Sequence, residues 1–587
     1  MSNSVRLMHR SLPAMDIRYF PEPEPRKKKR TQRGEEVFTH MLSAFYGKIL
    51  TIVGIALPLA GAITTSEYSY GVFYVYLYCG SILFFLYIYI VHLKVKSIHE
   101  RINNSQLHDF IDTLVGYRPY SYIRYGSFYF RMGVIGFGIG SFIYSALEVG
   151  QYFEYSSAES CRDLFNILKP VTRILFIILQ MLFIFSYDNF MDVQKSKLIA
   201  KFGLMHLIAT NLSDWFYVLV EFTQHDIFFS AKLMQDQSER YNQTLHVDDL
   251  KILQIFMHYK EKKMQCLNSD IMKSIRVRAA PHLAPCAVEY NILCMVILCV
   301  MWKNNCSEAS EEPSADLSAE LSRQSGCNTI YGRSQSQFSV DCAQAEKGLF
   351  GGVLLLAVTV ISLIMFFELV PNEGVRADVA LLQVNIWEAI LFWTATLAVL
   401  LSMKALRKIE IIQKERTLEL EHVLLLITQC GVFVYFVFQI IGACLMGRHK
   451  GTAGIRTIMR IVTPLSALVQ SCCQTVFILD AWPRRCSTKT EMKRKPGRQL
   501  ITFLLVINIS LWVVNRLKNN QSVSHPNQMD FYGVLTWNII THVSMPLVVS
   551  YRFQSTVCFY EIWKRVYKIR PLKSDIEVDN RDDDAPS

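Results

Sequence analysis

The sequence predicts an all-α polytopic membrane protein with twelve transmembrane helices, arranged as two homologous six-helix halves. Apolar stretches of about twenty residues, the length that a helix needs to cross a bilayer, recur along the whole chain. Of the 587 residues, 51% are hydrophobic and only 19% are charged, below the roughly 25% that is usual in soluble domains. A motif near the C-terminus also has an earlier copy, which indicates an internal duplication.

The predicted spans divide evenly between the two halves. The first six lie at residues 39–64, 70–97, 124–151, 166–190, 199–223 and 284–303. The second six lie at residues 347–370, 378–405, 419–446, 454–482, 499–517 and 531–566. A long polar segment, about 225–283, separates the fifth and sixth spans and is predicted to be partly helical. The expected domains are a cytoplasmic N-terminal tail (1–38), a first half (39–303), a flexible cytoplasmic linker rich in Ser and Glu (304–346), a second half (347–568) and an acidic cytoplasmic tail (569–587).

The distribution of Lys and Arg predicts the orientation of the chain. Most short basic loops follow even-numbered spans, including 404–416 and 484–498. Basic loops stay on the cytoplasmic side, so both termini are expected in the cytoplasm of a multi-pass protein of the cell membrane. Two segments depart from this pattern, 448–450 and the long segment 225–283. The net charge of +11 is attributed to these loops and not to nucleic-acid binding.

The internal repeat is clearest in the last span of each half. Four residues of the first copy align without a gap with four of the second: Pro285, Tyr290, Trp302 and Lys303 with Pro546, Tyr551, Trp563 and Lys564. Shorter matches occur in the fourth and fifth spans of each half. Because each half has an even number of spans, the two halves are expected to share one orientation, related by an axis along the membrane normal.

The repeat supplies the same three polar residue types to both halves. The fourth, fifth and sixth spans of each half carry Gln, Asn and Tyr, and these residues are Gln180, Asn211 and Tyr290, then Gln474, Asn508 and Tyr551. Polar side chains at membrane depth face the bundle interior or water. Each could simply hold helices together. Their recurrence as a set favours a shared role in a constriction.

Three sequence runs resemble the otopetrin family: FGLMHLIATNLSDW in the fifth span, VEYNIL followed by MWK in the sixth, and SYRFQSTVCFYEIWK in the twelfth. The resemblance covers about residues 40–566. It implies a homodimeric, proton-selective channel opened by extracellular acid, with lipid and sterol at domain interfaces. It also implies that the two Gln-Asn-Tyr sets constrict proton routes. Some family members carry an acid where this chain has Asn211, so direct titration at that position is not expected here.

Titratable residues flank the two sets. The candidates for a relay or a vestibule are Glu148, Asp214, Glu221, Glu289, Glu388 and His542. A buried carboxyl group can pass protons when its pKa approaches neutrality. For Glu148, Glu221 and Glu388, interhelical ion pairing is an equally good explanation. For His542, a packed core imidazole is the ordinary alternative.

Other functional classes fit the sequence less well. Two six-span halves also describe secondary transporters, but no pair of helices interrupted by Gly or Pro at matching positions is evident. No HExxH, GxSxG or paired catalytic Asp pattern lies on a span, so an enzyme is not expected. The cysteines form no CxxC pair, and no metal or cofactor is expected.

Overall fold

The computed structural model describes residues 26–64, 71–104, 128–154, 164–186, 197–241, 271–307, 345–369, 375–409, 411, 420–450, 455–486, 489–519 and 526–567. These residues are almost entirely helical. The β-structure among them is a single isolated bridge between Ile411 and Arg484. The chain is therefore an all-helical protein in the part that the structure describes.

The long helices follow the predicted spans. In the first half they are α1 (Arg26–Thr64), α2 (Gly71–Asn104), α4 (Phe128–Phe153), α5 (Phe165–Ser186), α6 (Lys197–Tyr241) and α8 (Ile271–Ser307). In the second half they are α10 (Glu346–Leu369), α11 (Val375–Leu406), α12 (Leu420–Lys450), α13 (Ile455–Ala481), α15 (Arg498–Val514) and α17 (Val534–Arg565). Short helices α14 (Lys489–Arg494) and α16 (Pro526–Tyr532) and a π-helical turn (Asn515–Asn519) complete the described elements.

Several helices are longer than their predicted spans. Helix α6 continues to Tyr241 and α8 begins at Ile271, so both reach into the segment that was predicted to be only partly helical. Hydropathy identifies only the part of a helix that crosses the bilayer. It gives no information about polar helical turns beyond that part. The predicted linker 304–346 and both predicted tails lie largely outside the described residues.

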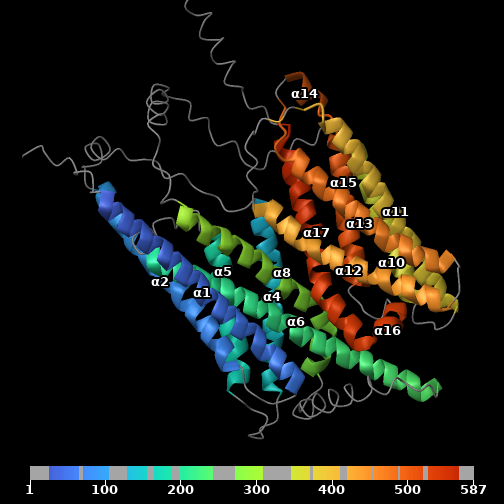
Figure 1. Cartoon of the computed structure of the whole chain (residues 1–587), viewed down its shortest axis with the longest axis horizontal. Helices are drawn as coiled ribbons and strands as arrows, with labels where there is room; N and C mark the ends of the chain where they lie inside the picture. The colour runs from blue at the N-terminus through green and yellow to red at the C-terminus, as the bar shows by residue number, and fades with distance from the viewer. Residues whose placement is uncertain are drawn as a thin grey trace, which may run out of the picture.

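Ten helices among the described residues are long and apolar enough to cross a membrane, which supports a multi-pass membrane protein. The other two long helices, α6 and α17, are more polar. Helix α6 packs against α1, α8 and α17, and helix α17 packs against α12, α15 and α6. Figure 1 shows these two helices where the blue-to-green helices meet the yellow-to-red ones. A helix surrounded by protein can carry polar side chains that lipid would exclude.

The two sets of helices pack in the same way. In the first half, α1 contacts α6, α6 contacts α8, α8 contacts α4, α4 contacts α5, and α5 contacts α2. The second half repeats this order with α10, α15, α17, α12, α13 and α11. Each set also has its own hydrophobic cluster, centred on residues such as Phe176 and Leu293 in one and Phe477 and Val548 in the other.

Prolines recur at matching places within these helices. Pro170 and Pro464 lie in α5 and α13, each ten residues before the predicted glutamine, and Pro285 and Pro546 lie in α8 and α17. These prolines match in position but do not interrupt their helices, since all four helices continue through them. Proline removes one backbone hydrogen bond, which helix neighbours in a membrane bundle can compensate.

Candidate functional site

The predicted Gln and Asn residues form amide pairs in both halves. Gln180 Nε2 donates to Asn211 Oδ1 at 2.9 Å, and Asn211 Nδ2 donates back to Gln180 Oε1 at 3.2 Å. Gln474 Nε2 donates to Asn508 Oδ1 at 3.0 Å, and Asn508 Nδ2 donates to Gln474 Oε1 at 3.1 Å. All four side chains are fully buried. The reciprocal bonds satisfy polar groups that would be costly to bury alone.

The predicted tyrosines occupy equivalent positions beside these pairs. Tyr290 donates to the carbonyl oxygen of Ile177 at 3.2 Å, and Tyr551 donates to that of Ser471 at 2.9 Å. Ile177 and Ser471 each lie three residues before the glutamine of their half. The structure therefore places each Gln, Asn and Tyr set on three neighbouring helices with the same bonding. Tyr551 has a further hydroxyl neighbour, Thr475 Oγ1 at 3.0 Å.

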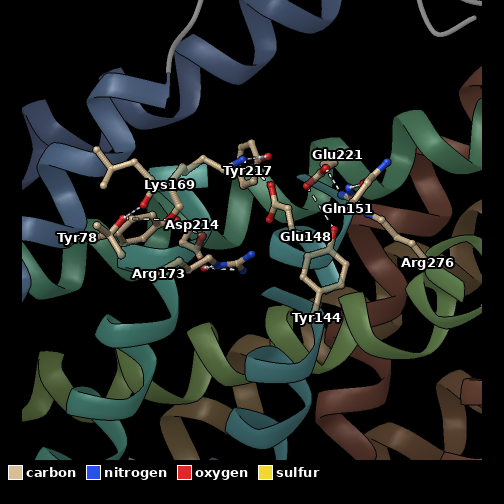
Figure 2. A network of polar contacts seen from close by, with 12 residues as sticks. Tyr78, Tyr144, Glu148, Gln151, Lys169, Arg173, Asp214, Tyr217, Glu221 and Arg276 are labelled. Carbon is tan, nitrogen blue, oxygen red and sulfur yellow. Dashed lines mark hydrogen bonds and ion pairs between the residues drawn. The ribbon is translucent and has the colours of Figure 1, made fainter. Parts of the chain in front are cut away.

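Three ion pairs connect α4, α5, α6 and α8 (Figure 2). They lie between the first amide pair and the C-terminal end of α6. Arg276 pairs with Glu221 at 2.6 Å, Lys169 with Glu148 at 2.9 Å, and Arg173 with Asp214 at 2.9 Å. The acidic side chains are 27%, 11% and 2% exposed, in that order. Burial thus increases step by step toward the amide pair. We call these six residues the ion-pair ladder.

Asp214 is the most connected residue of the ladder. It accepts hydrogen bonds from Arg173 Nε at 3.2 Å and Nη2 at 2.9 Å. Tyr78 donates to it at 2.5 Å and Asn291 at 2.7 Å. Because Asp214 lies one helical turn after Asn211, and Asn291 directly follows Tyr290, this carboxylate is next to the first Gln-Asn-Tyr set. Three donor groups stabilise its charge.

Tyrosines line the same region. Tyr144 donates to Glu221 at 3.3 Å, and Lys169 donates to the hydroxyl of Tyr217. Gln151 accepts a hydrogen bond from Arg276. Figure 2 shows Tyr217 beside Lys169, Tyr144 below Glu221 and Gln151 next to Arg276. The ladder is therefore a row of ion pairs between α4, α5, α6 and α8, with hydroxyl and amide groups beside the charges.

The second half has a different arrangement around its amide pair. Glu388 on α11 pairs with Lys518 at 3.0 Å, and Lys518 also donates to Asn385 at 2.9 Å. Arg552, next to Tyr551, donates to Gln470 Oε1 at 2.7 Å, and Gln470 donates to Gln474 at 2.6 Å. The side chain of Arg552 is fully buried.

Polar residues also join the two halves. Glu289, directly before Tyr290, accepts a hydrogen bond from Ser550, directly before Tyr551. His542 lies 3.4 Å from Asp226, and its ring is tilted against that of Phe222, with ring centroids 4.6 Å apart. Glu289 and His542 are therefore at the interface of α6 and α8 with α17, and neither lies beside an amide pair of its own half.

The structure separates the predicted relay residues into three groups. Glu148, Glu221 and Asp214 belong to the ladder, Glu388 pairs within the second half, and Glu289 and His542 lie between the halves. The basic partners of these acids are not among the residues predicted from the sequence. Arg173 and Lys169 interrupt an apolar run in the fourth span, and Arg552 lies inside the twelfth. A charged residue within a span is itself a sign of function, so this signal was available.

Comparison with known proteins decides the family. The otopetrin family model matches residues 129–553. The chain belongs to the otopetrin family. It is 36% identical to the proton channel OtopLc of Drosophila melanogaster over 95% of this chain and 37% of that protein. It is 22% identical to the mouse proton channel OTOP2, over 76% of this chain and 83% of that protein, and 20% identical to zebrafish OTOP1, over 75% and 79%.

These relatives are named as channels and not as enzymes. The otopetrin match includes both amide pairs, both tyrosines and the whole ladder. The chain spans less than half of OtopLc but most of the two vertebrate relatives.

Proposed function

We propose that this otopetrin is a proton-selective channel, opened by extracellular acid, that conducts through water and polar side chains inside its six-helix halves. The observation that carries the proposal is the repeated Gln-Asn-Tyr set, which is buried and has the same amide–amide and Tyr–carbonyl bonds in both halves, in a family whose named relatives are proton channels. The two sets, Gln180, Asn211 and Tyr290, and Gln474, Asn508 and Tyr551, are proposed as pore constrictions.

The chemistry of these side chains suits proton transfer. A proton moves along hydrogen-bonded chains, and amides and phenols can donate and accept in such chains without carrying a charge. An uncharged constriction also avoids the cost of a fixed charge at the bilayer centre. A filter for a larger cation requires rings of carbonyl or charged oxygens that replace its hydration shell. Gln, Asn and Tyr at one narrow point suit a water chain better.

We infer that the chain crosses the membrane twelve times, with α6 and α17 added to the ten apolar helices. The matching series of helix contacts in the two sets supports two homologous halves with one orientation. Both termini are then cytoplasmic, in agreement with the basic loops, and the cell membrane is the proposed location. In this orientation the exposed end of the ladder faces outside.

The flanking titratable residues are assigned roles by their positions. Glu221 and Glu148 are proposed to line an outer vestibule. Asp214 is proposed to lie on the proton path next to the first constriction. Glu388 is the corresponding candidate in the second half. Glu289 and His542 are proposed as relay groups between the halves, where Glu289 contacts Ser550 and His542 faces Asp226.

Two further proposals concern partners. Homodimerisation, with lipid and sterol at domain interfaces, rests on the family resemblance. The exposed apolar faces of α1 and α10, which include Phe45 (59% exposed) and Phe350 (73%), offer surfaces for lipid or for a second copy.

Voltage-clamp recording tests the proposed function. One pH unit is worth about 1.36 kcal/mol and 100 mV about 2.3 kcal/mol per charge, so a proton-selective current should reverse at a potential that moves by about 59 mV per pH unit. The current should appear on external acidification without any co-substrate. A reversal potential that follows another ion, or a current that needs a co-substrate, would favour a secondary transporter instead.

A further inference from the structure

The two halves differ in the layer next to their amide pairs. Seven residues before each glutamine lie Arg173 and Ala467, and three residues after each asparagine lie Asp214 and Leu511. The first half therefore has a buried ion pair where the second half has two apolar side chains. Ala467 and Leu511 are 0% and 1% exposed.

The apolar layer of the second half continues along α15. Val514, one turn after Leu511, is 1% exposed. The matching residue on α6 is Tyr217, whose hydroxyl accepts a hydrogen bond from Lys169. A narrow passage lined by such apolar side chains excludes water, and hydrophobic constrictions gate channels in this way. The first half offers hydroxyls and charges at the same depth.

The second half also contains a buried positive charge without an acidic partner. No ion pair between described residues includes Arg552, and its Nε and Nη2 have no hydrogen-bond partner. The guanidinium carbon lies 5.3 Å from the ring centroid of Tyr551 and 5.7 Å from that of Phe392. The acid one turn before Phe392, Glu388, pairs with Lys518 at 3.0 Å.

The first half balances its charge at the same position of the repeat. Asn291 stands where the second half has Arg552, and it donates to Asp214 at 2.7 Å. Arg173, the buried cation of the first half, is paired with the same carboxylate at 2.9 Å. At this position of the repeat the first half therefore has a paired charge, whereas the second half has the unpaired charge of Arg552.

We propose that protons pass through the first half, and that the second half is closed by the apolar layer at Leu511 together with the unpaired charge of Arg552. This inference rests on the proposed function and assigns the current to one of its two routes. A fixed guanidinium beside Tyr551 repels an approaching proton, and buried positive charge excludes protons and cations from other pores in this way. Arg552 donates to Gln470, and Gln470 donates to Gln474, so hydrogen bonds link the guanidinium to the constriction.

A matched pair of substitutions tests the inference. Asn211→Leu and Asn508→Leu each replace a buried amide with an apolar side chain of similar size, at equivalent positions of the two halves. With the current divided by surface expression, Asn211→Leu should lower the proton current at least about tenfold, and at least about fivefold more than Asn508→Leu lowers it, because a leucine at a narrow point breaks a water chain. Equal losses, or a larger loss in Asn508→Leu, would overturn the assignment.

Other outcomes are separable from the proposed function. If neither substitution changes a proton-selective wild-type current, the amide pairs do not line the route, while the chain remains a proton channel. If the wild-type current is not proton-selective, the proposed function itself fails. Should a leucine variant not reach the surface, Tyr290→Phe and Tyr551→Phe give the same comparison with a smaller change of volume.

A gain of current tests the two features that are proposed to close the second half. The Asn291–Asp214 distance indicates that an aspartate at position 511 would lie within reach of Arg552. Leu511→Asp in the Asn211→Leu background should therefore restore part of the lost current, since it pairs the guanidinium and makes the layer polar. Leu511→Met is the control and should restore none. A surface-expressed Leu511→Asp variant that conducts no better than this control would overturn the proposed cause of closure.

Discussion

Replacing Asp214 with asparagine should destabilise the protein more than any other single loss of an acid in the ladder. The side chains of Arg173 and Asp214 are 0% and 2% exposed. Asparagine keeps the shape of Asp214, so Tyr78 and Asn291 retain a neighbour, but the charge of Arg173 loses its counterion. Breaking a buried pair from one side costs about 3–5 kcal/mol, because the remaining charge stays in the interior.

The chain offers a matched control on another helix. Asp480 pairs with Arg484 at the same distance of 2.9 Å, but Asp480 is 30% exposed and Arg484 also donates to the carbonyl oxygen of Ile409. Asp480→Asn should therefore cost only about 0–1 kcal/mol. Thermal melting of detergent-solubilised protein, followed by fluorescence-detected size exclusion, compares the two variants. Equal melting midpoints for Asp214→Asn and Asp480→Asn would refute the reasoning.

Tyr290→Phe and Tyr551→Phe should both reach the surface, since one hydroxyl bond in a membrane interior is worth about 0.6 kcal/mol. Of the two, Tyr290→Phe should reduce the proton current more. Normal conduction in both variants and in the double variant would show that the hydroxyls are not needed for conduction. Glu221→Gln is expected to shift the dependence of current on external pH, and an unchanged curve would leave Glu221 only its ion pair with Arg276. Three Asn-x-Ser/Thr sequons test the orientation. Glycosidase shift assays should find sugar at Asn242 and Asn520, which are expected outside, and none at Asn305, which is expected inside. Modification of Asn305 would overturn the orientation.

The fold could be predicted well from the sequence because hydropathy and repetition act locally. Each predicted span overlaps a long helix, although helix ends such as Tyr241 in α6 lie far beyond the apolar stretch. The pairing of Gln180 with Asn211 could also be anticipated, since the repeat placed the same amides on the fourth and fifth spans of each half. Two independent occurrences of one pattern carry more information than one.

The ion-pair ladder could not be predicted in the same way. Glu221 and Glu148 were recognised as titratable, but the choice between relay and ion pairing depends on which basic side chain faces them. That choice is fixed by the rotation of neighbouring helices, which span boundaries do not specify. Arg276 lies 55 residues after Glu221 in the sequence. Lys169 lies on a different helix from Glu148. Proximity in sequence therefore gives no guide to either pairing.

The positions of Glu289 and His542 depended on a further level of structure. The sequence predicts only that both flank a Gln-Asn-Tyr set, whereas in the structure both contact residues of the other half. The interface follows from how two complete bundles pack together, and the sequence repeat describes only what happens inside each bundle. The repeat nevertheless has one visible consequence there, because Glu289 meets Ser550, its own equivalent.

The two long helices that are not among the ten most apolar ones, α6 and α17, both carry charged residues next to a Gln-Asn-Tyr set. Helix α6 carries Asn211, Asp214 and Glu221, and helix α17 carries Tyr551 and Arg552. Each is enclosed by other helices, so its polar side chains are stabilised by protein partners and the helix does not need a lipid-facing apolar surface. A duplication keeps equivalent buried positions in both halves while it frees one copy of each residue to change. The enclosed helices are then where the halves can diverge in charge without disturbing the fold, as Asp214 and Leu511 have done.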